Sequence, residues 1–431
     1  MSVNSAESPR TPPPKITSTE WALVLVLVAI HFTHMVDFVI IMPLGTRLMS
    51  ELNITPVEFA SIVAMYAIAA GIASLVGSLF MDRFDRRSVL LAMYGGFAVS
   101  TLLCGLAPTY EWLMVARTLA GIFGGLAAVT IMAVIGDVFP PEKRGRVTGA
   151  ITSAFAVASI VGLPIGLVLA DEFGRGAPFV VLAGFSVIVW VIAAFMLPQV
   201  RGHLEHARRS AASEFRAVIA EPNHQWAFAF SFFMVLGTFT VASFIAPYMT
   251  STNGWTEADL AKLYFAAGVC TLFGMNVVGR MADRFHRLTL FRVLAGMTVI
   301  ATLVITNLPP GPLWVAAAVM SLFMVFAAGR MVPAQAMLLG AALPRNRGAF
   351  MSLNTAVQHL ATGIAPMLAG LLITVADDGK MSGFPIVGYV AVILTLCSLI
   401  LAGRLRSAKA IVVPVELQPE PTPIAEPVAA A

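Results

Sequence analysis

The chain has 431 residues, of which 58% are hydrophobic and 12% are charged, whereas soluble domains carry about 45–50% apolar and about 25% charged residues. Its 27 Lys and Arg and 23 Asp and Glu are too few to cover a soluble protein of this length, which excludes a soluble enzyme and indicates lipid as the solvent. The formal net charge of +4 is small, so it favours basic loops at a membrane face over a nucleic-acid-binding groove.

Twelve apolar runs follow one another along the chain, and each is long enough for a membrane-spanning helix of about 20 residues. They lie at roughly 20–44, 58–80, 88–107, 111–137, 147–170, 177–198, 226–248, 258–281, 288–308, 313–339, 349–375 and 385–402. The sequence therefore predicts an all-α polytopic membrane protein with two pseudo-symmetric six-helix bundles, at 20–198 and 226–402, and a cytoplasmic linker at 199–225. The polar, Pro-rich residues 1–19 lack the apolar core of a signal peptide, and we expect them and residues 403–431 to be disordered tails.

Lys and Arg are unevenly distributed among the predicted loops. With a cytoplasmic N-terminus, 21 of the 27 basic residues lie in cytoplasmic tails and loops, and four lie outside, namely Arg47, Arg175, Lys262 and Lys380. This asymmetry predicts a multi-pass cell-membrane protein with both termini cytoplasmic, located in the inner membrane if the cell is Gram-negative. The remaining two, Arg117 and Arg330, lie within helices.

Three ionisable side chains, His31, His34 and Asp37, follow one another at three-residue steps in the first apolar run. A charge within a membrane helix costs about 2.5–3.5 kcal/mol and is normally retained for a reason. Asp37 and Arg117 lie at depths of about 12 and 9 Å from the outer ends of the first and fourth helices, so the two groups can meet. Their pairing can couple transport to protons as it opens and closes, or it can be a static ion pair that orients two helices.

The two histidines have several possible roles. Both can face a central cavity, where His34 can take part in proton coupling and His31 in cargo binding. Hydrogen bonding between helices is the alternative for each of them. No further ligands converge on them in the sequence, so we predict no metal site.

Two landmarks recur in the second half of the chain. Segments 82–86 and 283–287, DRFDR and DRFHR, are related by an offset of 201 residues, and Gly136 and Pro140 match Gly340 and Pro344 at an offset of 204. These offsets indicate that the halves are structural repeats. Parallel six-helix repeats are typical of transporters whose cargo site lies near the midplane and is exposed alternately to the two sides.

Charged residues also cluster in the predicted cytoplasmic loops. We interpret them as a gate that joins helix ends in one conformation, while the alternative is topological, because basic inner loops orient any membrane protein. The residues are Asp82, Arg83, Arg86, Arg87, Asp137, Arg144, Asp283 and Arg284.

Arg330 in the tenth run has no charged counterpart at the matching position around Leu126. An Arg in an apolar cavity favours an anionic or multiply hydroxylated cargo, while the alternative is that it extends to the cytoplasmic face or bonds helix-end carbonyls. Amides in the later helices are further candidates for the cargo site, although such groups also join helices. They are Asn276, Gln335, Asn354 and Gln358, with His359 beside Gln358.

Several of these segments match known family motifs. Ser78–Arg87 resembles the G-x-x-x-D-R-x-G-R-R signature of the major facilitator superfamily, with the leading Gly displaced to Gly77 and Asp85 at the inner Gly. Arg117–Gly121 is similar to the family's R-x-x-x-G motif, and Asp37 to its first-helix acidic motif. Gly162, Pro164 and Gly166 are similar to the Gly–Pro motif of antiporters, and we expect them to permit helix bending. The resemblance covers about residues 20–402 and points to the twelve-helix drug:proton antiporter and sugar-efflux branch.

The resemblance implies a secondary active transporter that exports a small drug- or sugar-like molecule by proton-coupled antiport and alternating access. A proton-coupled uptake symporter of a small organic solute and a non-transporting membrane receptor are the alternatives. GxSxG, HExxH and Walker motifs are absent from the sequence, so we predict no enzyme activity. The expected partners are a small-molecule substrate, protons and the lipid bilayer, with no cofactor and no nucleic acid, and we expect a monomer.

Overall fold

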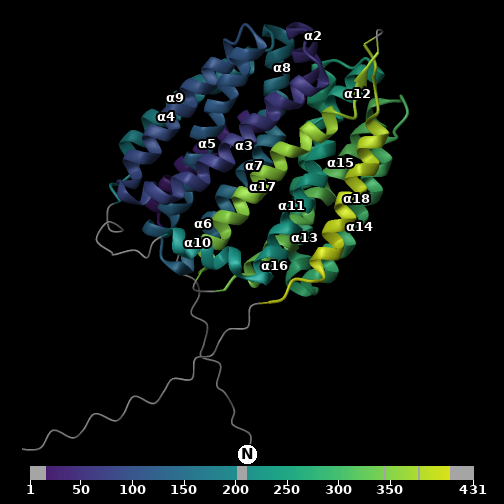
Figure 1. The fold of residues 1–431 in the computed structure, drawn as a ribbon. Helices are drawn as coiled ribbons and strands as arrows, with labels where there is room; N and C mark the ends of the chain where they lie inside the picture. The colour runs from purple at the N-terminus through teal and green to yellow at the C-terminus, as the bar shows by residue number, and fades with distance from the viewer. Residues whose placement is uncertain (1–15, 201–210, 344–345, 377–378, 408–431) are drawn as a thin grey trace, which may run out of the picture.

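The computed structural model describes residues 16–200, 211–343, 346–376 and 379–407. Most of the two predicted tails and residues 201–210 of the predicted linker lie outside these ranges. The described chain is almost entirely helical (Figure 1). The elements before residue 201 are α1 (Ser18–Ile40), α2 (Gly45–Leu52), α3 (Pro56–Phe80), the 3₁₀ turn η1 (Met81–Arg83), α4 (Arg86–Gly105), α5 (Tyr110–Val138), α6 (Pro141–Thr152), α7 (Ala154–Val157), the π-helical turn η2 (Ala158–Gly162), α8 (Leu163–Phe173) and α9 (Ala177–Met196).

The second part of the chain repeats this succession of long helices. Its elements are α10 (Ala211–Ala220), α11 (Pro222–Ala242), α12 (Ile245–Asn253), α13 (Glu257–Arg284), α14 (Arg287–Thr306), α15 (Leu313–Gly329), α16 (Met331–Ala341), α17 (Arg347–Gly370), the two-stranded antiparallel hairpin of β1 (Thr374–Val375) and β2 (Met381–Ser382), and α18 (Phe384–Ala402). We refer to α1–α9 as the N half and to α11–α18 as the C half. Figure 1 places α6, α10 and α16 at one end, here called the linker end, and α2, α8 and α12 at the opposite end, here called the far end.

Eleven membrane-spanning candidates are found among the described residues by length and apolar composition. The run predicted at 349–375 is the helix α17, which has the length of a span but carries Asn354, Gln358 and His359. These side chains fit its position, because α17 packs along α3 of the N half and along α11 rather than facing lipid on all sides. The all-α polytopic fold predicted from the sequence is confirmed.

Four of the apolar runs are interrupted where the sequence analysis predicted continuous helices. The chain breaks at 41–44, at 243–244 and at Arg330, and it forms the π-helical turn η2 before α8. A proline lies at or just after each of these places, at Pro43, Pro164, Pro247 and Pro333. Proline has no N–H and its ring clashes with the carbonyl four residues earlier, which disrupts the α-helical hydrogen bonds.

The halves begin their second long helices in the same way. Thr55 caps α3 and Thr256 caps α13, each in a capping box with an acidic residue three positions later. The preceding short helices α2 and α12 end on left-handed residues, Asn53 with φ 52° and Gly254 with φ 68°. Both pairs differ by 201 residues, the offset of the DRF segments, so one alignment relates the two halves from the first helix to the loop after the second.

The apolar cores are shared at the far end and separate at the linker end. One buried cluster contains residues of both halves, among them Phe59 of α3 and Phe244 beside α12, whose ring centroids are 5.5 Å apart. The buried residues of one of the other two large clusters, with Leu27, lie before residue 201, and those of the other, with Phe291, lie in α10 and the C half. Along the boundary, α3 packs on α17 and α8 packs on α13.

Candidate functional site

A buried ion pair joins the first and fourth long helices of the N half. Arg117 Nη1 in α5 lies 3.0 Å from Asp37 Oδ2 in α1, and the same nitrogen donates to the backbone carbonyl of Asp37 at 3.0 Å. Both side chains are fully buried, with 0% of their surface exposed. The structure thus brings together the two residues that, by their depths, can meet if the helices are neighbours.

Two aromatic side chains extend this ion pair. The guanidinium carbon of Arg117 lies 4.2 Å from the ring centroid of Tyr66 in α3, a cation–π contact. The Tyr66 hydroxyl is 2.8 Å from His34 Nδ1, so Asp37, Arg117, Tyr66 and His34 form one continuous set of contacts. Tyr66 was missed in the sequence analysis, because a tyrosine in an apolar run carries no pattern that distinguishes it from a packing residue.

Glycines of α5 make room for this network. A Cβ at Gly121 would lie 2.3 Å from the backbone oxygen of Tyr66, and one at Gly124 would lie 2.5 Å from His34 Nδ1. Glycine is therefore required at both positions for α5 to approach α1 and α3 this closely. The R-x-x-x-G spacing of Arg117 and Gly121 has a direct steric cause in this structure.

His31 and His359 lie near the same network. The His31 ring is 6.0 Å from that of His34, and its Nδ1 is buried without a hydrogen-bond partner. His359 of α17 lies against Gly71 of α3, where an added Cβ would come within 2.8 Å of the histidine Cβ. Groups of three or more metal-ligating side chains are not found among the described residues.

Arg330 lies at the break between α15 and α16 and is also fully buried. Its Nη2 donates to the carbonyl of Met234 at 3.1 Å and to Thr238 Oγ1 at 2.5 Å, both in α11. Its Nε and Nη1 have no hydrogen-bond partner. The side chain therefore does not extend to the surface of the protein.

The predicted amides occupy three different environments. Gln358 donates to Ser231 Oγ at 3.0 Å and so joins α17 to α11, while Asn354 is 1% exposed and its Oδ1 has no partner. Gln335 is half-buried. Asn276 is exposed and donates to the carbonyl of Leu272 on its own helix, so the structure does not bring it together with the other candidates.

The predicted gating residues lie at the linker end. Arg86 Nε is 3.0 Å from Asp137 Oδ2, Arg87 donates to the carbonyl of Ala194, and Arg144 donates to the carbonyl of Phe139 at 2.8 Å. These contacts all lie within the N half. Arg83, Asp283 and Arg284 are exposed, and only the backbone of Asp82 is described.

The DRFDR segment is fixed at its inner aspartate. Asp85 Oδ1 accepts a hydrogen bond from the backbone N–H of Val200 at 2.9 Å. Burial opposes ionisation of this carboxyl, but the hydrogen bonds from Val200 and Ser88 hold its pKa below the usual value. The segment thus ties the start of α4 to the chain that leaves α9.

Polar contacts between the halves are found at the far end. Arg47 of α2 forms an ion pair with Glu257 of α13 at 2.7 Å, and its Nε contacts Glu51 at 2.7 Å. Thr46 Oγ1 lies 2.5 Å from Thr250 Oγ1 of α12. Sequence reasoning assigned Arg47 only to an outer loop, because a pair of residues 210 positions apart has no local signal.

Pro164 and two glycines of the fifth run bring α8 against α1. Pro164 follows the π-helical turn η2, whose last backbone bond runs from Leu163 N to Ala158 O. A Cβ on Gly162 would lie 2.3 Å from Val36, and one on Gly166 would lie 2.6 Å from Ile40. The three motif residues thus combine a helix distortion with close helix packing.

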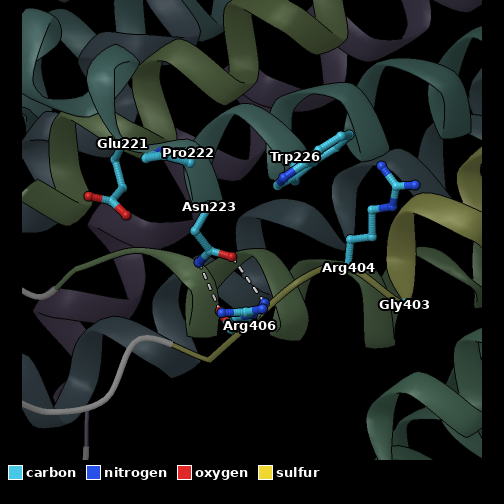
Figure 2. A pocket seen from close by; sticks show the side chains of 7 residues that line it. All are labelled: Glu221, Pro222, Asn223, Trp226, Gly403, Arg404 and Arg406. Atoms are coloured by element: carbon cyan, nitrogen blue, oxygen red, sulfur yellow. Dashed lines mark hydrogen bonds between the residues drawn. The ribbon is translucent and has the colours of Figure 1, made fainter.

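A cavity of about 670 Å³ opens at the linker end, away from the buried charges. Figure 2 shows Arg404 beside Trp226 and Asn223 hydrogen-bonded to the backbone of Arg406. The cavity lies between the start of α11 and the end of α18, and it contains none of the residues predicted for cargo or protons.

Comparison with known proteins gives a consistent result. The sequence matches the Major Facilitator Superfamily over residues 27–329 and again over 227–430. It is 26% identical to the MFS-type transporter YceJ of Bacillus subtilis, over 83% of this chain and 90% of that protein. It is 25% identical to a chloramphenicol efflux pump of Mycobacterium tuberculosis, over 61% of this chain and 64% of that protein.

The fold is similar to that of a bacterial homolog of the human lysosomal transporter Spinster. The TM-score is 0.68 at 16% sequence identity, and the alignment covers 90% of this chain and 95% of the other.

Proposed function

Because the chain belongs to the Major Facilitator Superfamily, we propose that this membrane transporter exports a small molecule in exchange for protons by alternating access. The observation that carries the proposal is the fully buried pair of Asp37 and Arg117. A carboxylate held by one guanidinium on a neighbouring helix can take up a proton when the helices separate and release it when they close. The adjoining hydroxyl and imidazole of Tyr66 and His34 place two further polar groups beside this pair.

The distribution of contacts supports alternating access. The two halves share an apolar core and an ion pair at the far end, whereas their buried cores are separate at the linker end. We assign the linker end to the cytoplasm from the excess of Lys and Arg there. On this assignment the described conformation is closed toward the outside. In the opposite conformation, the charged residues of segments 82–86 and 283–287 close the cytoplasmic side.

Export is favoured over uptake by the relatives. One of them is a chloramphenicol efflux pump, so chloramphenicol is the first cargo to test. The apolar surroundings of the seam between the halves fit a cargo with a large apolar surface, and Phe38 and Phe239 line this seam from opposite sides with ring centroids 5.9 Å apart.

The experiment compares Asp37→Asn with wild type in everted vesicles whose lumen is acidic. Wild type is expected to accumulate labelled chloramphenicol, while Asp37→Asn loses accumulation but retains exchange of labelled for unlabelled chloramphenicol. Glu111→Gln is the matched control, because this carboxylate lies exposed in the first turn of α5, the helix of Arg117. It is expected to behave as wild type.

Each other outcome has a distinct meaning. Proton-driven accumulation by Asp37→Asn at the wild-type rate would refute the role of the buried pair. Accumulation only when the lumen is alkaline would indicate symport. Binding of cargo without flux in either direction would indicate a receptor.

A further inference from the structure

Arg330 is the buried charge that the proposed proton pathway does not use. It is fully buried, and its two acceptors, the Met234 carbonyl and the Thr238 hydroxyl, are both neutral. The N–H groups on Nε and Nη1 have no partner. A buried guanidinium whose charge is not balanced is unfavourable, so a site of this kind is normally completed by an anion.

The internal repeat indicates that a carboxylate is the group missing beside Arg330. The offset of 201 residues that relates Thr55 to Thr256 and Asn53 to Gly254 also relates Asp37 to Thr238. In the N half, Arg117 therefore binds a carboxylate from the first long helix. In the C half, Arg330 binds the equivalent position of the matching helix, where the carboxylate is replaced by a hydroxyl.

No other side chain of the C half supplies the charge in the described structure. The carboxylates among residues 222–343, 346–376 and 379–407 are Glu257, Asp259 and Asp283, all in the first or last turn of α13. None of them contacts Arg330, whose hydrogen bonds both go to α11. No described carboxylate contacts Arg330, so a molecule that enters the site can supply the balancing charge.

The position of the site fits a cargo rather than a structural ion. Thr238 is followed by Phe239, whose ring packs against Phe38 of the N half at 5.9 Å, and Phe38 follows Asp37. The two phenylalanines are themselves related by the offset of 201. The residues that Arg117 and Arg330 bind, Asp37 and Thr238, thus each precede one of the two phenylalanines that meet between the halves.

We propose that the transporter also accepts acidic cargo, with a carboxylate on a largely apolar body, which Arg330 binds through its free Nε and Nη1 donors. This inference rests on the proposed transport function and adds the substrate class. Guanidinium groups bind carboxylates through short, charge-assisted hydrogen bonds. The neighbouring Thr238 and Met234 hold the guanidinium in place from the opposite side.

The test uses matched pairs of probes that differ only in charge. Purified full-length protein is titrated with naphthoate against naphthamide and with phenylbutyrate against phenylbutyramide, and binding is read from the shift in melting temperature. Wild type is expected to bind each carboxylate at least tenfold more tightly than its amide. In Arg330→Gln the two members of each pair are expected to bind equally.

A second variant remains informative if Arg330→Gln does not fold. Thr238→Asp places a carboxylate where the repeat has Asp37, so it is expected to raise the melting temperature without ligand and to abolish carboxylate binding. Thr238→Asn is the matched control, because it has the same shape without the charge, and it is expected to keep the preference for carboxylates.

Three results would overturn the proposal. In the first, wild type binds acid and amide equally or binds neither. In the second, Thr238→Asp binds carboxylates as well as wild type does. In the third, chloride shifts the melting temperature as much as the carboxylates do. The last result would indicate a counter-ion site. All three readouts measure binding at equilibrium, so they are independent of whether the protein exchanges cargo for protons.

Discussion

Replacing Glu257 with Gln is expected to weaken the closure of the far end. The Arg47–Glu257 pair spans the two halves at 2.7 Å, and its side chains are 27% and 13% exposed. Exposed ion pairs contribute about 0–1 kcal/mol and hydrogen bonds to charged groups about 1.5–3 kcal/mol. Because Gln still accepts a hydrogen bond, we expect the free energy that favours the closed conformation to fall by about 1 kcal/mol. This lowers the ratio of closed to open molecules about fivefold.

Pulsed electron spin resonance measures this ratio directly. Spin labels at Ser50 in α2 and at Gly311 in the loop before α15 report the separation of the halves, because both positions are exposed at the far end. The accessible Cys270 and Cys397 are first replaced by Ser. The population with the longer distance is expected to increase in Glu257→Gln relative to wild type.

Asp259→Asn is the control for this measurement. It removes the same charge from the same turn of α13, but the ion pair of Asp259 is with Lys262 of the same helix, at 2.9 Å. Its distance distribution should match that of wild type. Identical distributions for Glu257→Gln and Asp259→Asn would refute the contribution of the far-end ion pair to closure.

Three further substitutions, of which Gly136→Ala is a control, test the packing of the buried network. Gly121→Ala is expected to lower stability by about 1–3 kcal/mol, because the new methyl would overlap the backbone of Tyr66. Gly136→Ala, where the added carbon meets nothing within 4 Å, should leave the melting temperature unchanged or raise it. Tyr66→Phe removes the 2.8 Å hydrogen bond to His34 but keeps the ring beside Arg117, so it should cost about 1 kcal/mol. A melting temperature equal to wild type in Tyr66→Phe would contradict the assignment of that bond.

The sequence predicted those parts of the molecule that depend on composition and on position along a helix. Apolar runs of about 20 residues predicted the spans, because a segment of this length and composition crosses lipid as a helix. Counting residues from the helix ends predicted that Asp37 and Arg117 lie at similar depths and can meet if their helices are neighbours. The breaks in the helices could also have been predicted, because Pro43, Pro247 and Pro333 are visible in the sequence. A search for apolar runs overlooks them, because it takes no account of the N–H that proline lacks.

Contacts between distant segments were not predictable in the same way. The pairing of Arg47 with Glu257 and the contact of Tyr66 with His34 depend on how helices pack, which one sequence does not specify. Asn276 illustrates the reverse case, because its polarity suggested the cargo site but the structure leaves it exposed on α13. The repeat offset is the exception, since it relates Thr238 to Asp37 without any knowledge of packing.

The apolar core that the halves share at the far end also bears on leakage of ions. Phe59 and Phe244 meet edge to face there, and Gly45 fits so closely between Pro247 and Phe59 that even a methyl group would overlap both. A region packed this tightly with hydrocarbon has no space for a chain of water molecules, and protons cross proteins along such chains or between titratable groups. If the protein works by the proposed exchange for protons, this packing is expected to keep protons from leaking across the far end while no molecule is being moved.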